Sequence, residues 1–325
     1  MDKRALVTGV TGQDGIHLSE LLLEKGYEVY GLISGQRCES IQSFSKHRPE
    51  VKLIQGDLTD FSSVIKAIDE SQPSEIYNLG AISYVGMSFN QPELTANVTG
   101  LGLLRVLEAV RKLHLEKAVR IYQASSSEMF GKVRETPQTE LTPFHPRSPY
   151  GVAKTFAHYT SVQFREAYEM FISSGILFNH EGENRGFEFV TRKITSNIAR
   201  IKMGKQHRFS LGNIDSSRDW GYAGDYVEAM WLMLQHFEPG DFVIATGKSH
   251  TVREFVIAAL EAADLKPDLD LYLDYDKSMV RPSEVDTLIG DSTKARKILG
   301  WAPKLNFEQL VQLMVENDLR IESGK

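Results

Sequence analysis

Gly9-Val10-Thr11-Gly12-Gln13-Asp14-Gly15 is the stretch that decides the fold of this 325-residue chain. It joins a short apolar run, residues 5–8, to a helical pattern over residues 16–25. Glycines at such a junction let the backbone turn sharply and approach a pyrophosphate, which then rests on the unpaired N–H groups of the helix. The spacing is GxxGxxG, not the more common GxGxxG, and by itself such a turn also serves simple chain reversal.

The stretches that follow the turn alternate between strand-like and helical patterns. Strands are expected at 27–33, 51–56, 75–79, 119–124 and 175–178, and helices at 61–70, 92–113 and 151–168. Strands that alternate with helices of this length imply right-handed crossovers and a parallel sheet covered on both faces. In this context the glycine turn indicates a dinucleotide site. We therefore predict an α/β fold with a Rossmann-type, doubly wound parallel sheet.

The alternation ends near residue 180. Helical segments at 190–202, 225–234, 252–262 and 307–321 are separated by short extended pieces and by loops rich in Gly, Pro and Asp. We expect residues 1–180 to form the dinucleotide-binding Rossmann domain, with its sheet completed by part of 240–246. Residues 181–325 are expected to form mainly a smaller mixed α/β lobe that binds the substrate. A ligand cleft then lies at the carboxyl ends of the strands.

The composition argues against several classes of protein. A net charge of -6 disfavours a nucleic-acid partner, which usually needs a basic face. The single cysteine, Cys38, excludes an internal disulfide framework and a thiolate metal cluster, and it suits a reducing compartment. No apolar stretch reaches the roughly 18 residues that span a bilayer, and the N-terminus lacks a signal-peptide cleavage site. We expect a soluble, cytoplasmic protein without a metal site, a nucleic-acid partner or a membrane partner.

Tyr150 and Lys154 are the strongest catalytic candidates. Positions four apart lie on one face of a helix, so both side chains are expected to point toward the mouth of the sheet. An ammonium beside a phenol stabilises the phenolate and lowers the phenol pKa, which makes a usable base. A serine cluster precedes them at 125–127, and the Ser126 hydroxyl can hydrogen-bond the same substrate oxygen. YxxxK is common by chance, but its position after a serine cluster and a glycine turn indicates a dehydrogenase site.

The end of the second strand bears on the choice of dinucleotide. NAD sites commonly place an acid there to hold the ribose 2′-OH. Residues 31–37 contain no acid and one arginine, Arg37, which favours the 2′-phosphate of NADP and leaves NAD possible. Asp57 ends the third strand and either accepts a hydrogen bond from the adenine amino group or serves the entry to the next helix.

The glycine turn, the serine cluster and YxxxK together resemble the extended short-chain dehydrogenases/reductases. Within them the chain is most similar to the GDP-mannose 4,6-dehydratases. The resemblance covers nearly the whole chain and rests on the segments 8–15, 77–79, 122–125, 143–151, 175–181, 189–193, 218–221, 225–231 and 281–286.

The resemblance implies a set of ligand-binding residues. NADP would contact Gly9, Thr11, Gly12, Gln13, Asp14, Gly15, Arg37, Asp57, Leu58, Leu79, Gly80, Ala81, Ser83, Tyr150, Lys154, His180 and Arg185. A GDP-sugar would contact Ser83, Ser126, Glu128, Asn179, Val190, Lys193, Leu211, Arg218, Arg281 and Glu284. The basic groups in the second set would neutralise the pyrophosphate of the substrate. The helices at 92–113 and 151–168 would form the contact of a homodimer, or one contact of a homotetramer.

The resemblance also implies a reaction, in which GDP-mannose becomes GDP-4-keto-6-deoxymannose. Tyr150 takes the proton of the sugar 4-OH as hydride leaves C4. The new ketone acidifies the C5 proton, and Glu128 removes that proton and assists loss of the 6-hydroxyl as water. Hydride then returns to C6, so the cofactor is regenerated. The catalytic set is therefore Ser126, Glu128, Tyr150 and Lys154.

Several positions depart from the family pattern. Ser126 replaces a threonine, Ile82 replaces a glutamine, and residues 182–184 replace a segment that begins Ser-Pro. An aromatic residue is absent at Leu94, and Gly35 and Gln36 replace paired arginines that hold the 2′-phosphate and build a tetramer contact. A 4,6-dehydratase of a related sugar nucleotide such as a GDP-heptose therefore remains an alternative, as does a keto-sugar reductase or epimerase. A non-catalytic NADP-binding regulator is disfavoured, because the chain retains Tyr150 and Lys154.

Overall fold

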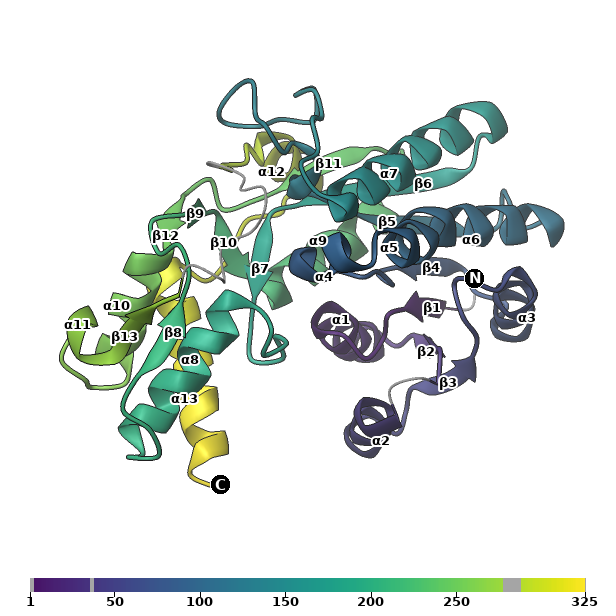
Figure 1. The fold of residues 1–325 in the computed structure, drawn as a ribbon. Helices are drawn as coiled ribbons and strands as arrows, with labels where there is room; N and C mark the ends of the chain where they lie inside the picture. Colours follow the sequence, from purple (N-terminus) through teal and green to yellow (C-terminus); the bar gives the residue numbers. More distant parts are fainter. Residues whose placement is uncertain (1–2, 36–37, 277–287, 325) are drawn as a thin grey trace.

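A computed structural model describes residues 3–35, 38–276 and 288–324 of the chain. Within these residues the central sheet has seven strands in the order β11-β6-β5-β4-β1-β2-β3, and each neighbouring pair is parallel. The strands are β1(Arg4–Thr8), β2(Glu28–Ile33), β3(Lys52–Gln55), β4(Glu75–Asn78), β5(Arg120–Ser126), β6(Phe171–Leu177) and β11(Asp241–Ile244). The predicted Rossmann-type parallel sheet is confirmed (Figure 1).

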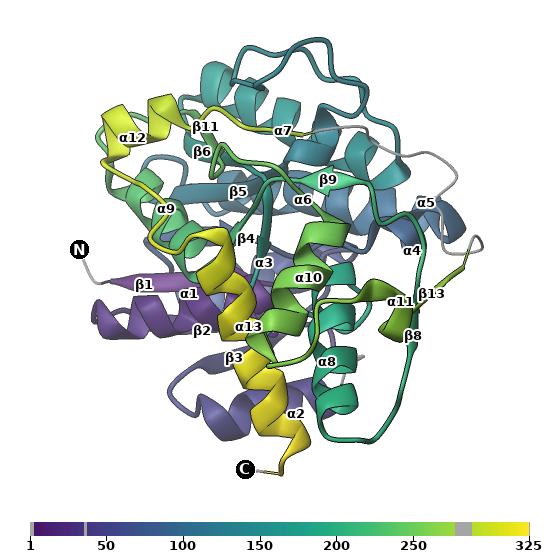
Figure 2. The ribbon, with the colours of Figure 1, turned by 90° about the vertical axis from the view of Figure 1, so that its left-hand side faces the viewer.

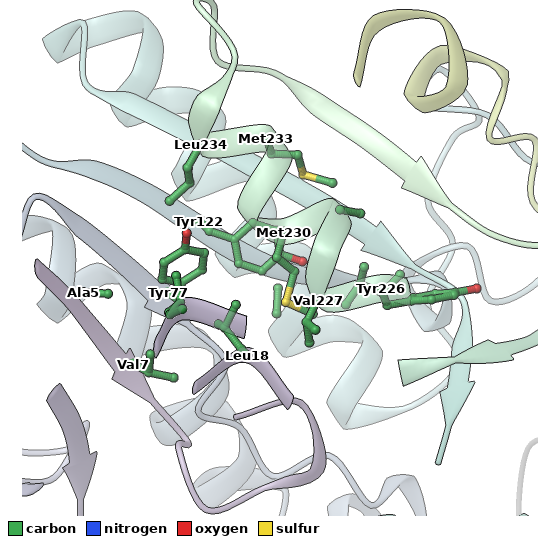
Figure 3. Packing of buried hydrophobic residues seen from close by; sticks show 14 of the residues in the cluster. Ala5, Val7, Leu18, Tyr77, Tyr122, Tyr226, Val227, Met230, Met233 and Leu234 are labelled. Carbon is green, nitrogen blue, oxygen red and sulfur yellow. The ribbon is translucent and has the colours of Figure 1, made fainter. Parts of the chain in front are cut away.

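Helices cover both faces of this sheet. One face carries α1(Gln13–Glu24) and α9(Ala223–Gln235), and the other carries α3(Phe61–Ser71), α6(Leu101–Lys112) and α7(Pro149–Tyr168). Figure 3 shows Leu18 of α1 and Met230 of α9 packed over Val7 and Tyr77 of the sheet. Burial on both faces agrees with strands such as β1 and β11, in which consecutive residues are buried.

A second core lies beside the sheet. It is formed mainly by α8(Val190–Lys202), α10(Val252–Ala262) and α13(Phe307–Glu322), which lie side by side in Figure 2. Short strand pairs flank these helices: β8(Phe209–Leu211) with β13(Leu273–Tyr275), and β9(Ser217–Arg218) with β12(His250–Thr251). A third pair, β7(Asn179–Glu181) with β10(Trp220–Tyr222), begins directly after β6 and so connects the two cores.

The remaining described elements are short. They are α2(Cys38–His47), α4(Val85–Asn90), α5(Pro92–Thr95), the π-helix η1(Ala96–Gly100), the 3-10 helix η2(Ser127–Met129), α11(Leu269–Tyr272) and α12(Thr293–Leu299). In the part of the chain that the structure describes, no helix is both long and apolar enough to cross a membrane.

Three sequence-based expectations about elements were wrong. The single helix expected at 92–113 is divided into α5, η1 and α6, and α2, α4 and α12 were not expected. β6 begins at Phe171, four residues before the expected start, because β5 supplies ladder partners from Phe171 onward and β11 adds partners from Ser174. The Ser173 hydroxyl also accepts a hydrogen bond from the Gly240 N–H at 3.2 Å, which satisfies a polar side chain inside the sheet.

A buried ion pair joins α8 to α13 in the second core. The Arg192 guanidinium lies 2.7 Å from the Asp318 carboxylate, with side chains 5% and 2% exposed, and the Thr195 hydroxyl donates to the same carboxylate at 2.6 Å. We expect Asp318→Ala to lower the free energy of unfolding by about 3–5 kcal/mol, because it leaves a buried guanidinium without its counter-ion. Chemical denaturation measures this loss. Replacing both partners, Arg192→Met with Asp318→Leu, is expected to recover most of it, and a double variant as unstable as the single one contradicts the explanation.

Candidate active site

A cleft of about 510 Å³ lies at the carboxyl ends of β1, β4, β5 and β6. It is the position at which open α/β sheets bind ligands. Seventeen of the predicted site residues line it: Gly9, Thr11, Gly12, Gln13, Asp14, Gly15, Leu79, Ala81, Ser83, Ser126, Glu128, Tyr150, Lys154, Asn179, His180, Arg185 and Arg218. The structure therefore brings residues that are up to 209 positions apart in the sequence into one cavity.

The glycine turn forms one wall of the cleft. Gly9 has a φ of 70°, a conformation that side chains disfavour, and a Cβ on Gly15 would lie 2.5 Å from the Gly9 carbonyl oxygen. These two glycines allow α1 to begin close to the end of β1. Gly12 is the N-cap of α1 and supplies no side-chain cap, so the first N–H groups of the helix are left for another partner.

The Ser126 and Glu128 side chains come from the end of β5. The Ser126 hydroxyl accepts a hydrogen bond from the Glu128 N–H at 3.2 Å and so caps η2. A Cβ on Gly151, in the first turn of α7, would lie 2.7 Å from the Glu128 carbonyl oxygen. The turn that carries Glu128 is therefore packed closely against the start of α7, the helix that carries Tyr150 and Lys154.

Tyr150 and Lys154 share one face of α7, as predicted. Ser148 caps this helix by accepting from the Gly151 N–H at 3.0 Å, and Pro149 occupies its first turn. Tyr150 is 8% exposed and Lys154 is 4% exposed. The Lys154 ammonium donates to the Ala124 carbonyl oxygen at 2.6 Å and lies 5.7 Å from the centre of the Tyr150 ring.

The expected lowering of the Tyr150 pKa by Lys154 is wrong for this structure. Burial raises the pKa of Tyr150 well above its ordinary value, and a hydrogen bond with Ser126 opposes this rise only in part. Burial also lowers the pKa of Lys154 to about 8, while the Asp14 carboxylate acts in the opposite direction. Both shifts have the same cause, since a low-dielectric site disfavours the charged form of each group.

Two buried carboxylates, Glu181 and Asp219, hold segments beside the cleft. Arg185 lies 2.8 Å from the buried Glu181 carboxylate, which also accepts from the Thr191 hydroxyl at 2.6 Å. Asp219 is fully buried and accepts from the Thr246 N–H at 2.9 Å and the Gly247 N–H at 2.8 Å. Asp219 thereby fixes the backbone next to Arg218, whose side chain reaches the cleft.

The other predicted ligand-binding residues are placed differently. Asp57 does not line the cleft; its carboxylate accepts from the Thr59 N–H and hydroxyl, both at 2.8 Å, which is the helix-entry role. Leu58 and Leu211 lie in the two cores, and the Gly80 N–H donates to the Thr8 hydroxyl at 2.9 Å. Val190 and Lys193 lie at the start of α8, outside the cleft lining. Arg37, Arg281 and Glu284 lie outside the described residues.

Sequence reasoning missed part of the cleft wall. Tyr84, Val85 and Met87 line it from α4 or its N-cap, and Phe189 faces Tyr84 with ring centres 5.9 Å apart. Glu188 also lines it, as does Ser125 of the predicted serine cluster. Two of these residues could have been found from their neighbours in the sequence. Tyr84 directly follows the predicted Ser83, and Phe189 directly precedes the predicted Val190.

Comparison with known proteins agrees with this geometry. A sequence model of the family described as "GDP-mannose 4,6 dehydratase" matches residues 6–314. The chain is 51% identical to GDP-mannose 4,6 dehydratase 1 of Arabidopsis thaliana, over 98% of this chain and 90% of the relative. The chain belongs to the GDP-mannose 4,6-dehydratase family. The human member is 49% identical over 98% of this chain and 91% of its own length.

Solved structures of related enzymes share the fold. A UDP-glucose 4-epimerase of Thermus thermophilus in complex with NAD superposes with a TM-score of 0.83 at 29% identity, over 97% of this chain and 98% of that one. RMD from Pseudomonas aeruginosa, complexed with NADPH, gives a TM-score of 0.82 at 25% identity, over 98% and 99% of the two chains. The family resemblance expected from the sequence motifs is confirmed.

Proposed function

We propose that this protein is an NADP-dependent enzyme that dehydrates GDP-mannose to GDP-4-keto-6-deoxymannose, with internal hydride transfer from C4 to C6. The observation that carries the proposal is the convergence of Ser126, Glu128, Tyr150 and Lys154 on the cleft that the glycine turn also lines. Family membership supports the same reaction, because the curated relatives are named for it.

The residues of the glycine turn fit a dinucleotide. The uncapped N–H groups of α1 suit a pyrophosphate, and the Gly9 and Gly15 backbones leave room for its approach. Residues 9–15, 79–81, Ser83, His180 and Arg185 would hold the cofactor together with Tyr150 and Lys154. When bound, the nicotinamide supplies a hydride acceptor for C4 and a hydride donor for C6.

The chain itself supplies the proton transfers. Tyr150 removes the proton of the 4-OH, and Ser126 hydrogen-bonds the same oxygen and favours the phenolate. Glu128 then removes the C5 proton and gives a proton to the 6-hydroxyl, which leaves as water. Overall, the sugar loses one water, and the hydride that leaves C4 returns to C6, so the cofactor is not consumed. Because burial raises the pKa of Tyr150, a positive charge beside the phenol would favour its loss of a proton.

The substrate nucleotide is assigned to the second lobe. Arg218 and Asn179 line the cleft on that side, and Lys193 lies on α8. With Ser83, Val190, Leu211, Arg281 and Glu284 they form the proposed GDP-sugar site. Residues 1–180 with part of 240–246 form the proposed cofactor half, and 181–325 mainly the substrate half. The position of β11 supports the inclusion of 240–246 in the cofactor half, because this strand pairs with β6 and extends the central sheet.

NADP is the proposed form of the cofactor. Arg37 supports it, and so does the similarity to RMD, whose structure contains NADPH. The similar epimerase of Thermus thermophilus contains NAD. Titration of the protein with NADPH and with NADH tests the choice, and tighter binding of NADH would reverse it. The single cysteine favours the cytoplasm as the proposed compartment.

The alternatives differ in product. The named relatives favour GDP-mannose over a GDP-heptose. A keto-sugar reductase or an epimerase would not need Glu128, and a non-catalytic regulator would not need Tyr150. Incubation with a panel of GDP-, UDP-, dTDP- and CDP-sugars, followed by mass spectrometry, separates these functions. Loss of one water from GDP-mannose is expected, whereas a gain or loss of two hydrogens would exclude dehydration.

A homodimer is the proposed assembly, either alone or within a homotetramer. An apolar groove of about 770 Å³ lies between η1 and α7, and it is lined by Ala96, Leu101, Val152 and Phe156 among others. Val152 is 56% exposed and Phe156 is 45% exposed. Exposed apolar surface of this kind typically marks an interaction site.

We expect Phe156→Glu to reduce the dimer to a monomer. A carboxylate placed in this apolar groove would lose its hydration without gaining a partner. Light scattering during gel filtration measures the mass. Phe237→Glu is the matched control, because Phe237 is 76% exposed and lies outside the groove. An unchanged mass for the Phe156 variant would place the dimer contact elsewhere.

A further inference from the structure

The glycine turn carries a carboxylate, Asp14, in the first turn of α1. One Asp14 oxygen lies 2.8 Å from His180 Nε2, and the other accepts from Gln13 Nε2 at 3.0 Å. His180 Nδ1 lies 2.8 Å from the Phe178 carbonyl oxygen. A carboxylate and a carbonyl can only accept hydrogen bonds, so both ring nitrogens carry protons and His180 is an imidazolium.

The surroundings of His180 maintain this state. Burial by itself lowers the pKa of His180, but the charge and hydrogen bond of Asp14, together with the hydrogen bond to the Phe178 carbonyl, raise it overall. The ring stacks on Tyr226, with ring centres 4.7 Å apart. Arg185 is a further cation near the pair, and it is 2.8 Å from the Glu181 carboxylate. Lys154 and Tyr150 interact with Asp14 from the α7 side.

A second hydrogen bond joins the glycine turn to His180. Gln13 Nε2 donates to the His180 carbonyl oxygen at 3.1 Å. Two consecutive residues of the turn therefore hold the backbone and the side chain of one residue, which lies 167 and 166 positions away from them. His180 belongs to β7, which pairs with β10 and connects the two cores. The pair consequently joins the cofactor turn to the region between the lobes.

The negative charge of Asp14 opposes the binding of a phosphate at this turn. The N–H groups at the start of α1 attract anions, and a carboxylate in the first helical turn competes with a phosphate for that attraction and repels it. We propose that the His180 side chain neutralises Asp14, so that the glycine turn can hold the diphosphate of a dinucleotide. His180 is then a positioning residue for cofactor affinity, acting through Asp14. This inference rests on the cofactor site proposed above.

A double-mutant cycle tests the proposal, with the Kd for NADPH measured by calorimetry on the full chain. We expect His180→Gln to raise the Kd at least ~10-fold, because it leaves the Asp14 carboxylate without its cation. The loss is expected to disappear when Asp14 is changed as well, so that the double variant with Asp14→Asn binds within about threefold of Asp14→Asn alone. Failure of the unmodified protein to bind NADPH would instead remove the proposed cofactor.

Two results would overturn the proposal. A double variant as weak as His180→Gln would mean that the imidazole acts on the cofactor directly. A tenfold loss of affinity in Asp14→Asn would mean that the carboxylate favours binding. If His180→Gln does not fold, the double variant and Asp14→Asn still decide the question. Asp318→Asn is the matched control, since it weakens a buried ion pair of α8 and α13 and is expected to lower Tm without changing the Kd.

Discussion

Tyr150→Phe is expected to lower kcat for the formation of 4-keto product by at least ~10²-fold, the typical contribution of a positioned acid–base group. The substitution keeps the buried ring and removes only the hydroxyl. The first step then lacks an acceptor for the 4-OH proton, because the Ser126 hydroxyl is itself a poor base. The rate is measured with saturating substrate, so that a change in substrate affinity does not affect the measured kcat.

The control for this variant is structural. Tyr150→Phe should keep its Tm, since the Ser148 cap and the first turn of α7 do not depend on the phenol. The Kd for NADPH is measured alongside, so that a loss of cofactor binding is separated from a loss of turnover. Turnover close to that of the unmodified protein would remove Tyr150 from the mechanism. A substitution of Lys154 would be harder to interpret, because the Lys154 ammonium also donates a hydrogen bond to the Ala124 carbonyl in β5.

Glu128→Gln is expected to reduce dehydration by ~10²–10⁴-fold, because an amide can neither take the C5 proton nor deliver one to the 6-hydroxyl. The backbone of η2 should be retained, since its cap uses the Glu128 N–H and not the side chain. Oxidation at C4 does not require Glu128. The variant is therefore expected to accumulate reduced cofactor, visible by its absorbance, when substrate is added.

The same variant separates dehydration from simpler chemistry. A reductase or an epimerase in this cleft would keep its turnover after an amide has replaced the Glu128 carboxylate. Normal product formation by Glu128→Gln would therefore contradict the proposed reaction, while a loss of turnover without any reduced cofactor would place the defect before C4 oxidation. Ser127→Ala is a suitable control, because this side chain lines the cleft beside Glu128 and has no assigned role.

The fold was predictable because its signals are local and repeated. The turn at 9–15, followed by regular alternation of strands and helices, identifies a parallel sheet before any contact is known. Helix α8 was expected with its observed bounds, 190–202. The split of the helix at 92–113 was not predictable, because η1 depends on how residues 96–100 pack against α7, and no local pattern encodes that packing.

The site was predictable where a residue lies next to a turn or a strand end. Ser126, Glu128 and Tyr150, which line the cleft, were predicted in this way. The contacts of other site residues were not predicted, because they join distant segments: His180 pairs with Asp14, and the Ala124 carbonyl accepts from Lys154. The pKa error for Tyr150 has the same origin. Spacing on a helix shows that two side chains share a face, but burial determines which charge state is stable.

The most direct test of the proposed reaction follows the hydride. GDP-mannose carrying deuterium at C4 is incubated with the protein and NADP, and the product is examined by NMR and mass spectrometry. Internal transfer predicts 4-keto-6-deoxy product with the deuterium at C6 and no net reduction of the cofactor. Product without deuterium at C6, or deuterium accumulating in reduced cofactor while a sugar is oxidised, would contradict it.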